Sequence, residues 1–206
     1  ELARDCGLDM PPSFYLRLSP KLAAFGVQRF DREQGLRVPI HSLAGLLHAN
    51  FRLPSAVDYS SFLRATQRLT RDVREVEKAY ARAVFNVLFH NHDDHPKNFA
   101  WRLNAQGRWQ LAPAFDLTFS TGPGGQHHMD IGGYGNAITR SHLLRLAQDS
   151  GVSVAYATDC IEHMLAQAAQ LPQRMRDFAH APDIRKSTQK QLITHIAACA
   201  QAASKP

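Results

Sequence analysis

Apolar side chains recur every three or four positions along several stretches of this chain, a period that indicates amphipathic helices. In the clearest stretch, 74–91, Val76, Tyr80, Val84 and Val87 share one face, and charged residues occupy the other face near the start. The same spacing predicts further helices at 1–8, 59–69, 140–151, 154–171 and 186–202. The second half of the chain is therefore expected to be largely helical.

A two-residue period, which is typical of half-buried strands, occurs in two places. Near the start of the chain, 13–18 and 22–30 flank the turn-forming sequence Ser-Pro-Lys. Further on, 99–103 and 108–113 flank Asn-Ala-Gln-Gly and alternate apolar with polar side chains. Both pairs predict antiparallel hairpins. The expected fold class is α+β, mostly helical with short β-hairpins.

The composition is that of an ordinary globular protein. Of the 206 residues, 44% are hydrophobic and 20% are charged, which supports one sizeable core. A formal net charge of +6 suits an acidic partner such as a nucleotide, although a well-solvated surface explains it equally well. The three scattered cysteines favour a reduced, cytoplasmic protein, and no membrane partner is expected because no stretch is apolar enough to span a bilayer.

The strongest candidate for chemistry is 90–98, which directly follows the clearest helix and holds three histidines and two aspartates. His90, His92, Asp94 and His95 fit the spacing His-x-His-x-Asp-His, which holds zinc in some hydrolases. That motif normally follows a strand in a β-rich fold, whereas this segment ends a helix. Zinc-dependent hydrolysis is therefore the less favoured alternative.

A second spacing in the same segment indicates magnesium and phosphate. Asp93 and Asn98 are five residues apart, a hairpin follows, and Asp116 lies beyond its second strand. Because the two ends of a hairpin meet in space, Asn98 and Asp116 are expected to converge near Asp93. Amide and carboxylate oxygens form a partial shell for Mg²⁺, and a further carboxylate can take the proton of a hydroxyl nucleophile. This is the arrangement of protein-kinase-like phosphotransferases.

These blocks resemble the HipA family of serine/threonine kinases, the toxins of bacterial toxin–antitoxin modules. The family signature is roughly Asn-x-Asp-x-His-x-Lys-Asn-Phe, then Leu-x-Pro-x-Tyr/Phe-Asp, and it occurs here at 91–99 and 111–116. The segment 26–32 is similar to the hinge of that family, although Gln28 stands where Glu is usual. The resemblance spans most of the chain and is least specific in the C-terminal helices.

The resemblance implies a HipA-type, protein-kinase-like C-terminal lobe that uses ATP and Mg²⁺ to phosphorylate Ser or Thr on a protein, aminoacyl-tRNA synthetases being among the substrates of the family. By this similarity Asp93 is the catalytic base, and Asn98 and Asp116 hold Mg²⁺. The implied nucleotide contacts are Gln28, Arg29, Phe30, His95, Pro96, Lys97, Asn98, Phe115 and Asp116. The implied partner is a helix-turn-helix antitoxin, through which DNA would be contacted only indirectly.

The resemblance also implies a division of the chain. Residues 1–32 would be the edge of the nucleotide-binding lobe with the hinge, and 33–206 the helical catalytic lobe. No phosphate-binding glycine loop precedes the hinge, so the remaining nucleotide lobe and its lysine are expected upstream of residue 1. The chain alone is then expected to be nearly inactive. A catalytically silent module that binds the antitoxin is a further alternative.

Three polar residues near these blocks have no chemical role in the kinase-like interpretation. Asp94 is expected to be a solvated neighbour of Asp93. His127 and His128, within the glycine-rich segment 121–136, are likewise expected to face solvent.

Overall fold

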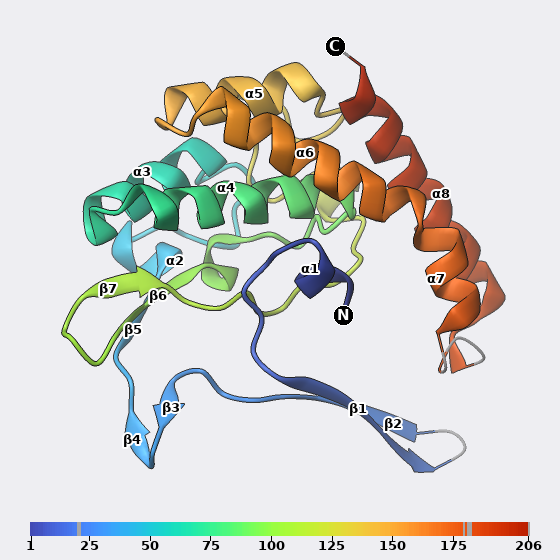
Figure 1. Cartoon of the computed structure of the whole chain (residues 1–206), viewed down its shortest axis with the longest axis horizontal. Coiled ribbons are helices and arrows are strands. Elements are labelled where there is room, and N and C mark those ends of the chain that lie inside the picture. The colour runs from blue at the N-terminus through green and yellow to red at the C-terminus, as the bar shows by residue number, and fades with distance from the viewer. Residues whose placement is uncertain (20–21, 179, 181–182, 206) are drawn as a thin grey trace.

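Helices form most of the second half of the chain, as the hydrophobic period predicts (Figure 1). The computed structural model describes residues 1–19, 22–178, 180 and 183–205. Within these ranges no helix has the length and apolar character needed to cross a bilayer. The helices are α1 (Leu2–Asp5), α2 (Leu43–Leu46), α3 (Tyr59–Thr70), α4 (Val73–Leu88), α5 (Arg140–Asp149), α6 (Val154–Ala169), α7 (Leu171–Asp177) and α8 (Lys186–Ser204).

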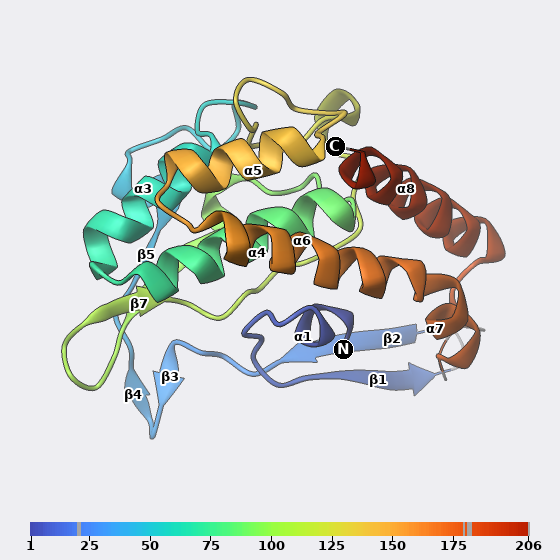
Figure 2. The same ribbon diagram turned by 45° about the horizontal axis from the view of Figure 1, so that its top comes forward.

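Helix α4 is the centre of the core, since 12 of its 16 residues are buried. Helices α3, α6 and α8 pack against it (Figure 2). At its start, the side chain of Asp72 accepts a hydrogen bond from the N–H of Arg74. The helix ends at Leu88, earlier than predicted, and His90 adopts a left-handed φ of 55°. The chain therefore leaves the core directly into the segment 90–98.

Three short strands form an antiparallel sheet in the order β5 (Ile40–Ser42), β6 (Ala100–Leu103) and β7 (Trp109–Leu111). The alternating pattern predicts the β6–β7 hairpin, and the structure confirms it. It does not predict β5, whose three residues are too short to show a period. Trp101 of β6 is wholly buried, with its ring 5.9 Å from that of Phe62 in α3. This packing fixes the hairpin directly after the candidate segment.

The N-terminal strands β1 (Ser13–Ser19) and β2 (Leu22–Val27) pair as an antiparallel hairpin, as predicted. A second, smaller pair follows in β3 (Arg32–Glu33) and β4 (Leu36–Arg37). Figure 1 shows both pairs extending away from the helical body. The expected strand 22–30 stops at Val27, so the predicted hinge contacts Gln28, Arg29 and Phe30 lie between the two pairs.

The C-terminal helices depart from the prediction at one junction. The predicted helix 154–171 is α6, and α7 begins immediately after it with Pro172 in its first turn. Proline suits this position because the first N–H groups of a helix have no intrahelical acceptor. The mostly helical α+β fold expected from the sequence is confirmed.

Candidate functional site

The segment 90–98 forms a loop between α4 and β6 that ends in a 3₁₀ turn, η1 (Pro96–Asn98). Two backbone hydrogen bonds join the start of the loop to the chain after β7. The N–H of His92 donates to the carbonyl of Ser120 (3.1 Å), and the N–H of Ser120 donates to the carbonyl of His90 (3.0 Å). The two segments therefore lie side by side.

The hairpin is attached at its own base as well. The N–H of Ala112 donates to the carbonyl of Ala100 (2.9 Å). Asp116 lies in the chain between this bond and the attachment at the start of the loop. The chain on both sides of Asp116 is therefore attached to the stretch 90–100, which contains Asp93 and Asn98.

Of the three polar residues, Asn98 keeps a side-chain oxygen available to a cation. Asn98 is buried, and its Nδ2 donates to the carbonyl oxygen of Asp93 (2.9 Å), which leaves its Oδ1 available as a ligand. Asp93 is half-buried and Asp116 is exposed. Asp116 has a φ of 55°, a left-handed conformation that is uncommon outside glycine and concentrates at functional sites. Carboxylate and amide oxygens of this kind bind Mg²⁺.

Two predicted nucleotide contacts lie next to each other. The ring centroids of Phe30, in the hinge, and Phe115, after β7, are 5.3 Å apart. The guanidinium of Arg102 in β6 donates to the carbonyl of Phe30 (3.2 Å), which ties the hinge to the hairpin. The two aromatic rings could form one wall of a nucleotide pocket.

The other predicted hinge contacts are engaged within the chain. The backbone N–H of Gln28 donates to the carbonyl of Pro12 (2.8 Å). The guanidinium of Arg29 donates to the carboxylate of Asp31 through Nε (2.8 Å) and Nη2 (2.6 Å). The hydrogen bond from Arg29 is the main reason that the pKa of Asp31 is lowered to about 2. Arg29 therefore helps to shape the hinge.

Two further predicted contacts, His95 and Lys97, pack on Phe51. Lys97 Nζ lies 4.3 Å from the Phe51 ring centroid, and the ring of His95 lies 5.6 Å from it. A cation–π contact at an exposed position contributes only about 0.5–1 kcal/mol. Lys97 could therefore leave Phe51 for a phosphate at small cost.

Four imidazole rings form a row beside the loop. The centroid distances are 4.5 Å from His195 in α8 to His90, 3.9 Å from His90 to His92, and 4.0 Å from His92 to His127. Burial, followed by the neighbouring imidazoles, lowers the pKa of His90 to about 4 and that of His92 to about 3. His90 and His92 are therefore neutral at neutral pH and pack as aromatic side chains.

The residues of the zinc-like spacing do not converge. The rings of His90 and His92 contact each other at a tilt of 43°, whereas His95 packs against His128, at a centroid distance of 5.8 Å. The Asp94 carboxylate is hydrogen-bonded to His127 Nδ1. Across the described ranges, no three His, Cys, Asp or Glu side chains are arranged to hold a metal ion. The geometry gives no support to the zinc hydrolase alternative.

Asp94 is wholly buried, so the expectation of a solvated side chain is wrong. Its carboxylate accepts hydrogen bonds from the Tyr59 hydroxyl (2.6 Å), His127 Nδ1 (2.7 Å) and the N–H of His128 (2.7 Å). Burial raises the pKa of Asp94, but His127 and the hydrogen bonds outweigh it, and the net pKa is lowered.

His127 and His128 are buried too, which corrects the expectation that they face solvent. The signal in the sequence was the run His127–Met129, the bulkiest stretch in an otherwise glycine-rich segment. Large side chains within such a segment mark the point where a loop is anchored to the core.

Comparisons with known proteins identify the family. The sequence matches the HipA-like C-terminal domain over residues 1–171. The fold is similar to a chain in the solved complex of the Shewanella oneidensis MR-1 toxin–antitoxin system HipA, HipB and its operator DNA, with a TM-score of 0.74 and 19% sequence identity. That match covers 98% of this chain and 54% of the other, so this chain spans about half the length of the chain it matches.

At this identity the structural likeness is one of fold, and it confirms the HipA-type fold class expected from the sequence. Helix α8, which supplies His195 to the imidazole row, lies beyond residues 1–171 of the family match. The family match extends over far more than half of the residues. This chain belongs to the HipA-like C-terminal domain family.

Proposed function

We propose that this chain is the catalytic lobe of an ATP- and Mg²⁺-dependent protein serine/threonine kinase, the toxin of a cytoplasmic toxin–antitoxin module. One observation carries the proposal. Backbone hydrogen bonds at Ala112 and Ser120, on either side of Asp116, join its segment to the chain that carries Asp93 and Asn98, and the neighbouring Phe115 contacts Phe30. This supports the proposal because phosphoryl transfer depends on positioning and charge stabilisation by several groups together.

The residues then take distinct roles. Asn98 Oδ1 and the Asp116 carboxylate hold Mg²⁺, which when bound neutralises charge on the phosphate oxygens. Asp93 orients the hydroxyl of the acceptor and takes its proton. Phe30 and Phe115 border the adenine side, and His95 to Asn98 lie along the phosphates.

The proposed activity also needs groups outside the chain. A phosphate-binding loop and lysine are part of the HipA resemblance, and the matched chain is about twice as long. We therefore expect the 206 residues alone to bind nucleotide weakly and to turn it over very slowly. Activity is expected in the full-length protein, on a protein hydroxyl such as that of an aminoacyl-tRNA synthetase.

Calorimetric titration of the 206-residue chain with a non-hydrolysable ATP analogue tests the site. We expect Mg²⁺-dependent binding that Asp116→Asn weakens by ~10-fold or more, because the amide has no charge to attract the cation. Asp149→Asn, at an exposed position in α5, is the matched control and should bind as the wild type does. Binding that needs no Mg²⁺, or that Asp116→Asn leaves unchanged, would contradict the assignment.

The catalytic role is tested in the full-length protein. Asp93→Ala should abolish phosphate incorporation into protein and leave nucleotide affinity nearly unchanged, since the base does not hold the nucleotide. Incorporation that persists in this variant would exclude Asp93 as the base.

A silent antitoxin-binding module is the second candidate. It is favoured by the solved relative, which is a complex of HipA with HipB and operator DNA. By this likeness we propose a helix-turn-helix antitoxin as partner in either case, with DNA contacted only through it. A full-length protein that captures the antitoxin but shows no Mg²⁺-dependent nucleotide binding would establish the silent module.

A further inference from the structure

Asp94 adjoins the proposed base in sequence but has no part in the proposed chemistry. Its buried carboxylate accepts hydrogen bonds from one helix and from one loop. Tyr59 of α3 donates at 2.6 Å. From the glycine-rich loop, defined as residues 121–136, His127 Nδ1 and the N–H of His128 donate at 2.7 Å each, and the N–H of Met129 donates at 3.4 Å.

These donors mark the point where the glycine-rich loop is held. His127–Met129 and Ile131 are buried, whereas 123–126 and 132–137 are exposed apart from the half-buried Gly135. Several glycines on either side have positive φ, among them Gly124 and Gly133. Ordering one such residue costs about 1–2 kcal/mol of backbone entropy, so a loop of this composition needs an anchor.

A chain of side-chain hydrogen bonds fixes the Tyr59 hydroxyl that donates to the Asp94 carboxylate. Asn91 Nδ2 donates to Asn86 Oδ1 (2.9 Å), and Asn86 Nδ2 donates to the Tyr59 hydroxyl (2.9 Å), which in turn donates to Asp94. This relay connects α4, α3 and the loop 90–98. The anchor therefore has a fixed position relative to the proposed catalytic residues.

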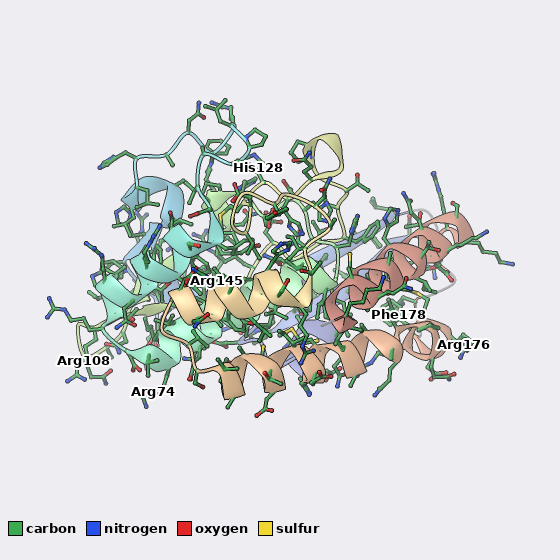
Figure 3. The ribbon with its side chains drawn as sticks, turned by 90° about the horizontal axis from the view of Figure 1, so that it is seen from above. Arg74, Arg108, His128, Arg145, Arg176 and Phe178 are labelled. Atoms are coloured by element: carbon green, nitrogen blue, oxygen red, sulfur yellow. The ribbon has the colours of Figure 1, made fainter. Side chains whose placement is uncertain are left out.

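The anchored part of the loop lies close to the proposed base. The N–H of His128 also donates to the carbonyl of His92 (3.2 Å), and its ring packs against His95. Burial is the main cause that lowers the pKa of His128, and the nearby carboxylates of Asp94 and Asp93 oppose it. In the view from above, His128 lies among the loops, far from Arg176 and Phe178 (Figure 3).

We infer that Asp94 is a positioning residue that fixes the glycine-rich loop against the catalytic loop and thereby sets how the protein acceptor meets Asp93. We place the protein acceptor at this loop because the loop follows Asp116 in the chain and lies beside the segment that carries the proposed base. This part of the inference rests on the proposed function. An ionised carboxylate suits the task because all of its lone pairs can accept, whereas an amide offers one oxygen only.

Hydrogen–deuterium exchange of the 206-residue chain tests the anchor without any need for activity. Asp94→Asn keeps the shape but turns an NH₂ group towards a donor, so peptides covering 121–136 should exchange ~10-fold faster or more. Peptides from α6 should exchange as in the wild type. Asp130→Asn is the matched control, because Asp130 lies in the same loop and its carboxylate accepts a local bond from the N–H of Gly133 (2.9 Å), while its bond to the N–H of Tyr59 (3.0 Å) uses the backbone carbonyl, which the substitution keeps. Unchanged exchange in Asp94→Asn would overturn the inference.

Phosphotransfer kinetics of the full-length protein test the positioning. Asp94→Asn should raise KM for the protein acceptor and lower kcat by ~10–100-fold, because small displacements of reacting groups are costly. KM for ATP should change much less than KM for the acceptor, although His95, one of the proposed phosphate contacts, packs against His128 of this loop. A variant that merely folds less well would lose active enzyme without a selective change in the acceptor KM, and that result would overturn the inference.

A second variant distinguishes a loss of positioning from a loss of folding. His127→Phe removes one donor and leaves the other bonds of Asp94, so it should produce the same acceptor-specific change to a smaller extent. Equal losses for acceptor and ATP in both variants would contradict the positioning role. If the full-length wild type transfers no phosphate, the proposed function fails, and the exchange experiment still decides whether Asp94 anchors the loop.

Discussion

Two buried imidazoles should make the stability of this chain depend on pH. Burial and neighbouring rings lower the pKa of His90 to about 4 and of His92 to about 3, from an ordinary 6.5. Below pH 6.5 these imidazoles therefore bind protons in the unfolded chain, whereas in the folded chain His90 does not do so until about pH 4. The contribution of these two imidazoles to stability should be constant above this window and fall within it by several kcal/mol, at about 1.4 kcal/mol per unit of pKa shift, which urea unfolding at several pH values would measure.

A substitution in the imidazole row tests whether these histidines cause the pH dependence of stability. His90→Leu removes one titrating group and should make the fall in stability between neutral pH and pH 4.5 shallower. His41 is exposed in β5, so His41→Gln should leave the profile as in the wild type. A profile that is equally steep in all three proteins would show that the row does not govern it.

Single residues also show what the sequence could and could not reveal. The relation of Asp93 to Asn98 is visible because both lie in one short segment, and the hairpin logic adds Asp116. The role of Asp94 is not visible, because its partners Tyr59 and His127 are 35 and 33 residues away. A buried carboxylate is recognised by its donors, and donors distant in the sequence are known only once the chain is folded.

At the scale of elements, the start of α4 bears on the site, because the helix leads directly into the loop 90–98. Asp72 Oδ1 accepts from the N–H of Arg74 (3.0 Å) as the helix cap, and the Arg74 side chain is the main cause that lowers the pKa of Asp72 to about 2. Asp72→Ala should lower the free energy of unfolding by about 1 kcal/mol, as measured by urea denaturation.

The matched control for this cap is Asp149→Ala. Asp149 pairs with Arg145 four residues earlier on the surface of α5, and exposed pairs of this kind contribute at most about 0.5 kcal/mol. Equal losses in the two variants would mean that the Asp72 cap contributes no more than a surface ion pair.

The elements differ in how far they could be predicted. The longer helices α3, α4, α5, α6 and α8 follow from their apolar period, whereas the four-residue α2 does not, and the break between α6 and α7 is marked only by Pro172. Strand β5 was missed because its three residues become a strand only by pairing with β6, which is a tertiary interaction.

At the scale of the whole molecule, exposed apolar surface is concentrated on the β1–β2 hairpin. Phe14, Leu16, Leu18, Leu22 and Phe25 are each 48–71% exposed. A two-stranded ribbon has two open edges and is marginally stable alone, and apolar faces of this kind promote association. Exposed apolar side chains on this hairpin are also expected if the hairpin belongs to a nucleotide lobe whose other strands come from additional residues of a longer protein.

We therefore expect the isolated 206-residue chain to self-associate as its concentration rises, which sedimentation velocity would measure. Leu16→Thr with Leu18→Thr should suppress the association, because threonine keeps strand propensity while removing apolar area. Leu36→Thr is the matched control, since Leu36 is 71% exposed but lies in β4, outside the hairpin. A chain that stays monomeric throughout, or association that the double variant leaves unchanged, would contradict this reading of the hairpin. In the full-length protein the double variant should instead lower stability, because there the same side chains would be buried against the rest of the lobe.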